Sequence, residues 1–145
     1  MTRFPYIFII VATLLFASPA FCDTVELYST GGVRRVEVEV ASTRAERARG
    51  LMFRAGLKEN HGMWFIFNND NRKTFWMKNV RFPIDIIFID KDFIIQKIWR
   101  SVPPCKEEPC AVYSSGTSVR YVLEVASGFC EKNGVLENQR VQYTP

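Results

Sequence analysis

Short runs of alternating hydrophobic and polar residues follow one another along the chain after residue 23. Thr24 to Ser29 alternates Val25 and Leu27 with polar neighbours, and Val33 to Ala41 alternates in the same way after the turn signal Gly31-Gly32. Alternation with a period of two residues is typical of a strand that buries one face. The two segments therefore predict a β-hairpin with one face toward water.

A short helix is predicted directly after this hairpin. Thr43 and Glu46 have the spacing of a capping box, in which each residue satisfies a backbone N–H group of the other. Apolar residues then recur at helical spacing as far as Gly50. The predicted helix carries three basic side chains, Arg44, Arg47 and Arg49.

The rest of the chain predicts further short strands. They are expected at Gly62 to Phe67, Thr74 to Lys78, Ile84 to Ile89, Phe93 to Trp99, Val119 to Val125 and Arg140 to Thr144. Between them the sequence predicts polar turns at Asn68 to Arg72 and Asp90 to Asp92, a long loop at Arg100 to Ser118, and one helical turn at Gly128 to Gly134. Many short strands with little helix favour a mainly β single domain, a β-sandwich or a barrel-like sheet with one or two short helices.

The first 22 residues are predicted to be a signal peptide. Arg3 supplies a positive charge, Tyr6 to Phe16 is an uncharged apolar run, and small residues follow at Ser18 to Ala20. Because roughly 20 apolar residues are needed to span a bilayer, cleavage is favoured over an uncleaved membrane anchor. We expect residues 23–145 to be a single β domain, periplasmic or secreted, with membrane contact only through an uncleaved leader.

The four cysteines of the chain are relevant to whether this compartment is oxidising. Cys105 and Cys110 are expected to form a disulfide, because exported proteins meet oxidising conditions and the pair lacks the spacing of a redox motif. Cleavage after Cys22 leaves Cys130 as an unpaired thiol, whereas cleavage after Ala20 leaves Cys22 as a possible partner for it.

Charge and motifs exclude several classes of function. The formal net charge is +4, and without the leader an excess of three positive charges remains, which is too small to indicate a nucleic-acid-binding surface. The sequence has no zinc, calcium, nucleotide or serine-hydrolase motif, so we expect no metal and no cofactor. His61 is the only histidine, and its neighbours Asn60 and Gly62 favour an exposed loop.

Candidate site residues gather around the corner from Asn79 to Pro83. Alternation places Phe75 and Met77 on one face of a strand and Trp76 and Lys78 on the other. A tryptophan face beside an ammonium group can hold a planar or anionic ligand. Alternatively, Trp76 packs under a loop while Lys78 extends past it into water.

A carboxylate interrupts the apolar strand that follows this corner. Asp85 needs a partner if it is buried, and Lys78, Asn79 or Arg81 across the corner would supply one. The result would be a structural ion pair or a carboxylate with a shifted pKa that marks a functional site. Arg49, at the end of the predicted helix, either joins this group or is a solvated surface residue.

Six sequence blocks in a fixed order resemble the domain-of-unknown-function family 192. They are Arg49-Gly50-Leu51-Met52-Phe53-Arg54, Gly62-Met63-Trp64-Phe65, Phe75-Trp76-Met77-Lys78-Asn79, the run Pro83 to Asp90, Pro104-Cys105 and Tyr121-Val122-Leu123-Glu124-Val125. The resemblance covers nearly all of the chain after the leader. It implies a compact β-sandwich of jelly-roll character that is often exported, and it implies no established activity, so no catalytic residue is transferred.

The favoured hypothesis is a binding module for a small polar or anionic ligand, with the ligand-binding residues Arg49, Trp76, Lys78, Asn79, Asp85 and Tyr113. One alternative is a hydrolase- or lyase-like enzyme in which Asp85 acts as general acid or base beside Lys78. The other is a structural or partner-binding envelope protein that uses the basic residues from Arg34 to Lys58. No sequence feature specifies an oligomeric state.

Overall fold

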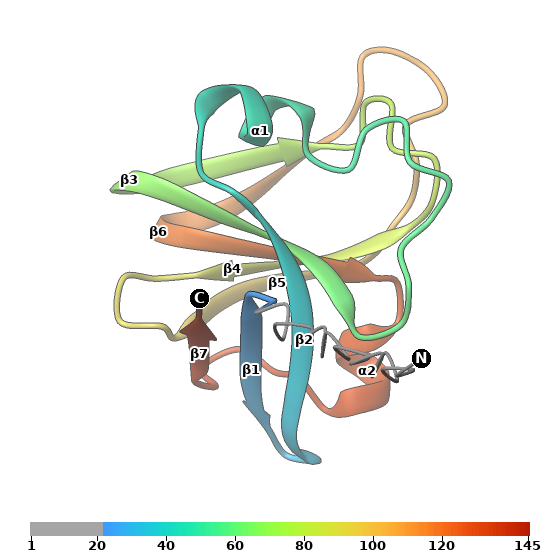
Figure 1. Ribbon diagram of the computed structural model, residues 1–145. Coiled ribbons are helices and arrows are strands. Elements are labelled where there is room, and N and C mark those ends of the chain that lie inside the picture. Colours follow the sequence, from blue (N-terminus) through green and yellow to red (C-terminus); the bar gives the residue numbers. More distant parts are fainter. Residues whose placement is uncertain (1–21) are drawn as a thin grey trace, which may run out of the picture.

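The structure, a computed structural model, describes residues 22–145, so the predicted signal peptide lies outside the described residues except for the exposed Cys22. Seven strands form one mixed sheet in the order β5-β4-β6-β3-β2-β1-β7, in which only β2 and β3 are parallel (Figure 1). The elements are β1 (Thr24–Ser29), β2 (Gly32–Ala41), α1 (Arg44–Arg49), β3 (His61–Trp76), β4 (Ile84–Ile89), β5 (Ile95–Val102), β6 (Val112–Ala126), α2 (Phe129–Asn133) and β7 (Val141–Thr144).

The two outer strands of the sheet, β5 and β7, meet at one end. Ile94, just before β5, forms an isolated bridge with Arg140, just before β7. The backbone N–H of Ile95 also donates to the carbonyl of Gln139 at 2.9 Å. The sheet therefore curls back on itself, which protects its edges from unwanted pairing. The predicted mainly β, barrel-like fold with short helices is confirmed.

Two strands are longer than the sequence predicts. β3 runs through residues 68–72, where a turn was expected from the polar sequence, because it stays paired with β6 across register shifts between Ile66 and Asn71 and between Arg72 and Thr74. β6 already begins at Val112, so the predicted loop of residues 100–118 shortens to residues 103–111. These two boundary predictions are wrong, because the pairing partner lies far away in the sequence.

The apolar side chains of the sheet form two clusters on opposite faces. The first includes Trp64, Ile87 and Leu123, and the second includes Phe65, Phe88, Val122 and Met63. Along β6, Leu123 and Val125 belong to the first cluster and Val122 to the second, so period-two geometry directs Glu124, which lies between Leu123 and Val125, toward the second cluster. As predicted, every residue of β4 is buried, which makes it a central strand.

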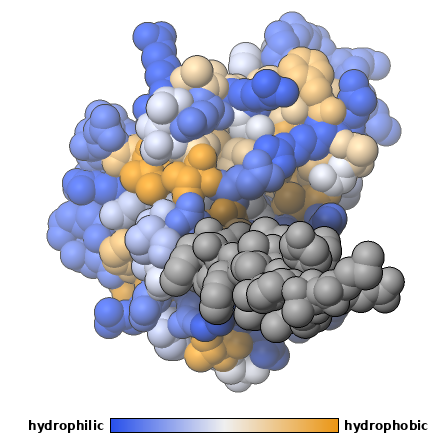
Figure 2. Space-filling model, in the orientation of Figure 1, coloured by the Kyte–Doolittle hydropathy of each residue, from blue (hydrophilic) through white to orange (hydrophobic). Residues whose placement is uncertain are grey.

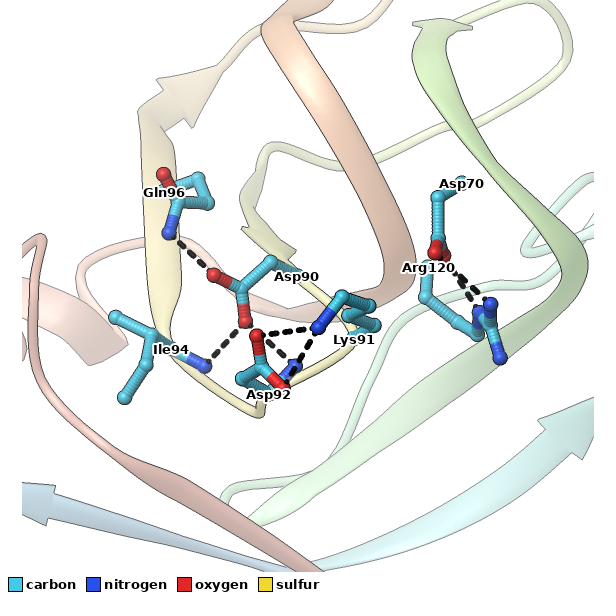
Figure 3. A network of polar contacts seen from close by, with 7 residues as sticks. All are labelled: Asp70, Asp90, Lys91, Asp92, Ile94, Gln96 and Arg120. Atoms are coloured by element: carbon cyan, nitrogen blue, oxygen red, sulfur yellow. Dashed lines mark hydrogen bonds and ion pairs between the residues drawn. The ribbon is translucent and has the colours of Figure 1, made fainter.

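The predicted turn between β4 and β5 is held by the side chain of Asp90 (Figure 3). Its Oδ1 accepts hydrogen bonds from the backbone N–H groups of Asp92 and Ile94, each at 2.9 Å, and its Oδ2 accepts one from Nε2 of Gln96 at 2.6 Å. A side chain that accepts from its own loop in this way stabilises a tight turn.

Hydrophobic and hydrophilic side chains alternate in small patches on the face shown in Figure 2. Within residues 22–145, neither helix has the length and apolar content needed to cross a membrane. The most exposed large apolar side chains include Phe53, Trp76 and Val112.

Candidate functional site

A carboxyl group points into the second hydrophobic cluster. Glu124 lies on β6, between Met63 of β3 and Ile86 of β4 in the sheet register, and only 4% of it is exposed. Among the described residues it forms no ion pair. Burial raises its pKa to about 8, because removal from water disfavours the charged form. At neutral pH the carboxyl is therefore mostly protonated, and it can both donate and accept a hydrogen bond.

Glu124 lines a small pocket of about 30 Å³. The walls are formed by the end of α1 and the segment that follows it, Arg49 to Met52, and by Phe75 and Trp76 at the end of β3. In Figure 1, α1 lies above β3, at the end of the molecule opposite to β1 and β7. A water-sized group needs roughly 10–15 Å³ of such space, so the pocket accommodates about two of them.

The capping box at the start of α1 helps to place Arg49 at this pocket. The backbone N–H of Glu46 donates to Oγ1 of Thr43 at 3.2 Å, and the Glu46 carboxylate accepts from the Thr43 N–H at 2.8 Å. The helix has no buried residue, so its ends contribute much of its stability. It ends at Gly50, whose φ of 46° is strained for other residues.

The side chain of Arg49 has no polar partner among the described residues, whereas its neighbours Arg47 and Arg54 are engaged. Within residues 22–145 its guanidinium forms no hydrogen bond and no ion pair, and the residue is exposed, while its backbone carbonyl accepts from the Met52 N–H at 3.0 Å. Arg47, by contrast, donates to the carbonyls of Ser42 and Ile66, and Arg54 forms an ion pair with Glu39. Arg49 is therefore a free cation at the rim of a pocket whose floor is a neutral acid.

Trp76 forms the opposite side of the rim. As the alternation predicts, Met77 is buried, whereas half of Trp76 is exposed. Nζ of Lys78 lies 5.5 Å from the centroid of the Trp76 ring and 2.6 Å from Oε1 of Glu108. The ammonium group of Lys78 therefore lies over the ring of Trp76 at the rim, but its charge is already paired with Glu108.

Asn79 supports the pocket wall. Its Nδ2 contacts Sδ of the wall residue Met52 at 3.9 Å, and its carbonyl accepts from the Phe53 N–H at 2.9 Å. Both Asn79 and Phe53 have left-handed backbone angles, φ of 59° and 66°. Such angles are uncommon for a bulky residue and concentrate at functional sites.

Cys105 and Cys110 form the expected disulfide, and the loop that it closes carries Glu108. Tyr113 follows this loop. Its ring packs edge-on against Trp99, with 5.5 Å between the ring centroids, and it borders a different hollow of about 200 Å³ beside the disulfide loop. Tyr113 therefore does not contribute to the pocket at Glu124.

Asp85 has different partners from those that the sequence suggests. It is fully buried, and its carboxylate accepts hydrogen bonds from the backbone N–H groups of Ser101 at 2.8 Å, Gly128 at 3.2 Å and Cys130 at 2.9 Å. Since Lys78 pairs with Glu108 instead, the acid–base pair of Asp85 and Lys78 is not formed. Backbone donors satisfy the buried charge, and Asp85 attaches β5 and α2 to β4.

The structure therefore brings together part of the predicted site. Arg49 and Trp76 line one pocket, and Lys78 and Asn79 lie beside it. Glu124, the floor of that pocket, is not among the residues predicted from the sequence. A carboxylate inside an apolar strand is the signal that singles out Asp85, and the same signal is present in Val122 to Val125.

Most basic residues between Arg34 and Lys58 are engaged. Arg34 donates to Asn133, Arg35 pairs with Glu26, and Arg54 pairs with Glu39. Within the described part of the chain this leaves Arg44, Arg49 and Lys58 without a polar partner. Two of the seven basic side chains, Arg35 and Arg54, are thus neutralised by carboxylates, and two more, Arg34 and Arg47, are held by neutral acceptors.

His61 begins β3 instead of lying in a loop. Its Nε2 lies 3.3 Å from Oε2 of Glu37, and its Nδ1 lies 2.9 Å from the carbonyl of Glu59. Across residues 22–145, no three His, Cys, Asp or Glu side chains come together as a metal site would need.

Comparison with known proteins identifies one matching family and similar solved structures. The sequence profile of family DUF192, described as an uncharacterized ACR, matches residues 25–143. A crystal structure of a candidate transcription regulator from Sinorhizobium meliloti 1021 is 33% identical, with a TM-score of 0.77, and the alignment covers 83% of this chain and 92% of that chain. A protein of unknown function from Novosphingobium aromaticivorans is also 33% identical, with a TM-score of 0.77, covering 82% and 83%. A search of curated proteins gives no match.

Proposed function

The chain belongs to the DUF192 family, whose description assigns no activity, and we propose from the site itself that the protein is a binding module for a small polar or anionic ligand. One observation carries the proposal. A buried acid without an ion-pair partner lines a pocket whose rim holds an arginine that is also unpaired among the described residues. A buried carboxyl group without a partner is costly to the fold, and such groups in a pocket are concentrated at functional sites.

Each residue of the pocket has a distinct role in this proposal. Arg49 supplies the attraction for an anion, and Glu124 supplies a donor and an acceptor at the floor. Trp76 offers a flat apolar surface for the part of the ligand that stays outside the pocket. Lys78 adds positive potential near the Trp76 ring, reduced by its ion pair with Glu108.

The description of the S. meliloti relative as a candidate transcription regulator suggests a DNA-related role as an alternative. The features of this chain favour it less, because DNA binding needs a surface of unpaired basic residues. Here most of the basic side chains from Arg34 to Lys58 have partners. An enzyme that uses Asp85 is also disfavoured, since the carboxylate is fully buried and saturated by backbone donors.

We further propose that the protein works in the periplasm or outside the cell. The disulfide between Cys105 and Cys110 supports this location, because such bonds persist in oxidising compartments.

Binding is tested by NMR titration of the protein with a library of small acids, amides and sugars. Ligands are expected to shift the amide signals of Gly50, Met52 and Glu124 and the indole signal of Trp76. Arg49→Ala should weaken binding at least tenfold. Arg44→Ala is the matched control, because Arg44 is an exposed arginine on the same helix that does not line the pocket. The proposal fails if no compound shifts these signals, or if Arg44→Ala weakens binding as much as Arg49→Ala does.

A further inference from the structure

We propose that the pocket at Glu124 takes a monocarboxylate with an apolar body, its carboxylate placed between Arg49 and Glu124 and its body against Trp76. This inference rests on the proposed binding function and specifies the ligand class. It follows from the chemistry of the floor, the number of free cations, the size of the pocket and the character of the rim.

The floor of the pocket, the carboxyl group of Glu124, favours a ligand group that accepts a hydrogen bond. A protonated carboxyl donates one hydrogen bond, and a ligand carboxylate is the strongest small organic acceptor for such a donor. The groups packed around Glu124 are apolar on both neighbouring strands, Met63 on β3 and Ile86 on β4. The charged groups that share its pocket are Arg47 and Arg49 at the α1 end. All of these neighbours are compatible with an anion, and none favours a cation.

The charge of the pocket matches one negative charge. Arg47 is held by the carbonyls of Ser42 and Ile66 and lies over the Phe67 ring, so Arg49 is the one guanidinium lining the pocket that is free among the described residues. A guanidinium pairs with a carboxylate through two parallel hydrogen bonds. A phosphate dianion would bring about twice the charge to this single cation.

The size of the pocket also favours a carboxylate. A volume of about 30 Å³ accommodates roughly two water-sized groups, which corresponds to the two oxygens of a carboxylate. The four oxygens of a phosphate or sulfate need more space than this.

The rim is suited to an apolar body. Trp76 is 50% exposed, and Val112, its register partner on β6, is 62% exposed. A third apolar side chain, Phe53, is 57% exposed and directly follows the wall residue Met52. Exposed aromatic and aliphatic side chains beside a polar pocket are typical of a ligand site with an apolar component.

The test compares three probes that share one apolar body and differ in the head group: benzoate, benzamide and phenyl phosphate. Their dissociation constants are measured by calorimetry or NMR between pH 6.5 and pH 9.5, where benzoate stays ionised. Benzoate should bind at least tenfold more tightly than either of the others at pH 6.5. Its affinity should fall about 30-fold by pH 9.5, because ionised Glu124 repels it.

Glu124→Gln separates this effect from a general effect of pH. The amide keeps a hydrogen-bond donor at the floor and cannot ionise, so this variant should bind benzoate with an affinity that stays constant within about threefold over the same range. A pH dependence that persists in Glu124→Gln overturns the proposed placement of the carboxylate.

The outcomes also separate this inference from the proposed function. If benzamide or phenyl phosphate binds at the Trp76 and Gly50 signals as tightly as benzoate, the carboxylate inference is wrong and the binding function stands. If none of the three probes and no library compound shifts these signals, both are wrong.

Discussion

Asp85 and Glu124 are buried carboxyl groups on the neighbouring strands β4 and β6, and they point to opposite faces of the sheet. Three backbone N–H groups surround Asp85, so its negative charge can remain in the interior. Glu124 lies in the second hydrophobic cluster with no such donors, and burial raises its pKa. The fold thus provides backbone donors for the carboxyl group of Asp85 and leaves that of Glu124 without them.

Glu124 should make the protein less stable as the pH rises. Its pKa is 4.5 when exposed and about 8 in the fold, so the folded protein holds a proton that the unfolded chain releases between these values. The free energy of unfolding should therefore fall by about 5 kcal/mol between pH 4.5 and pH 8, and then level off. Urea denaturation across this range, with Glu124→Gln as the reference, measures the effect. Parallel curves for the two proteins would contradict the raised pKa.

Asp85→Asn should destabilise the fold by about 3 kcal/mol. The amide nitrogen of asparagine would face a backbone N–H that now donates to a carboxylate, which leaves a buried donor unsatisfied. Urea denaturation at pH 7 measures the change. Asp92→Asn is the control, because Asp92 lies on the exposed turn beside Lys91 and its loss should cost less than about 0.5 kcal/mol. Equal effects of the two substitutions would refute the structural role of Asp85.

Among the elements, α1 depends most on its cap. It has six residues and no buried side chain, yet it places Arg49 at the pocket. Thr43→Ala removes the hydroxyl that accepts the Glu46 N–H and should lower the free energy of unfolding by about 1 kcal/mol. Thr43→Ser retains the acceptor and should remain within about 0.3 kcal/mol of the wild type. The explanation fails if thermal or urea denaturation does not distinguish the two variants.

β3 contains a glycine that permits close approach of β6. A Cβ atom added to Gly62 would lie 2.7 Å from the carbonyl oxygen of Glu124 and 3.1 Å from Cδ1 of Leu123. Gly62→Ala should therefore destabilise the fold by about 2 kcal/mol, because the backbone of β6 has to shift.

Gly56→Ala is the matched control for this substitution. A Cβ atom at Gly56 would have no atom within 4 Å, so the change in stability should be less than about 0.5 kcal/mol. Similar denaturation midpoints for Gly62→Ala and the wild type would show that β3 and β6 tolerate more space between them.

The elements that the sequence predicts well are those determined by residues close to one another in the chain. The first hairpin follows from the alternation around Gly31-Gly32, and the start of α1 follows from Thr43 and Glu46. A turn was expected at the polar segment 68–72 because its own sequence does not show that β6 pairs with it. The paired residues of β6 lie about 45 residues further along the chain. The pocket combines residues near 50, 76 and 124, so only its separate parts are visible in the sequence.

At the scale of the whole molecule, the disulfide loop of residues 105–110 supports the rim of the site from outside the sheet. The loop carries Glu108, which holds Lys78 beside Trp76. Replacing both Cys105 and Cys110 by serine should cost about 2 kcal/mol of stability, because the unfolded chain regains the freedom that the cross-link removes.

The state of the thiols can be measured directly. When the purified protein is alkylated without a reductant, Cys105 and Cys110 should stay unlabelled both in buffer and in urea, because they are bonded to each other. Cys130 is fully buried and should be labelled only in urea. Peptide mass spectrometry reports each cysteine separately, and labelled Cys105 or Cys110 before reduction would contradict the cross-link.

The pairing of β1 with β7 places Thr24 opposite Thr144. A short peptide could therefore connect these two positions, and new ends could be opened in an exposed segment such as the one around Gly56. In Figure 1, β1 and β7 lie at the opposite end of the molecule from α1. A tether at residue 145 would attach the protein to a sensor chip through β7, an element that does not line the pocket of Arg49 and Trp76.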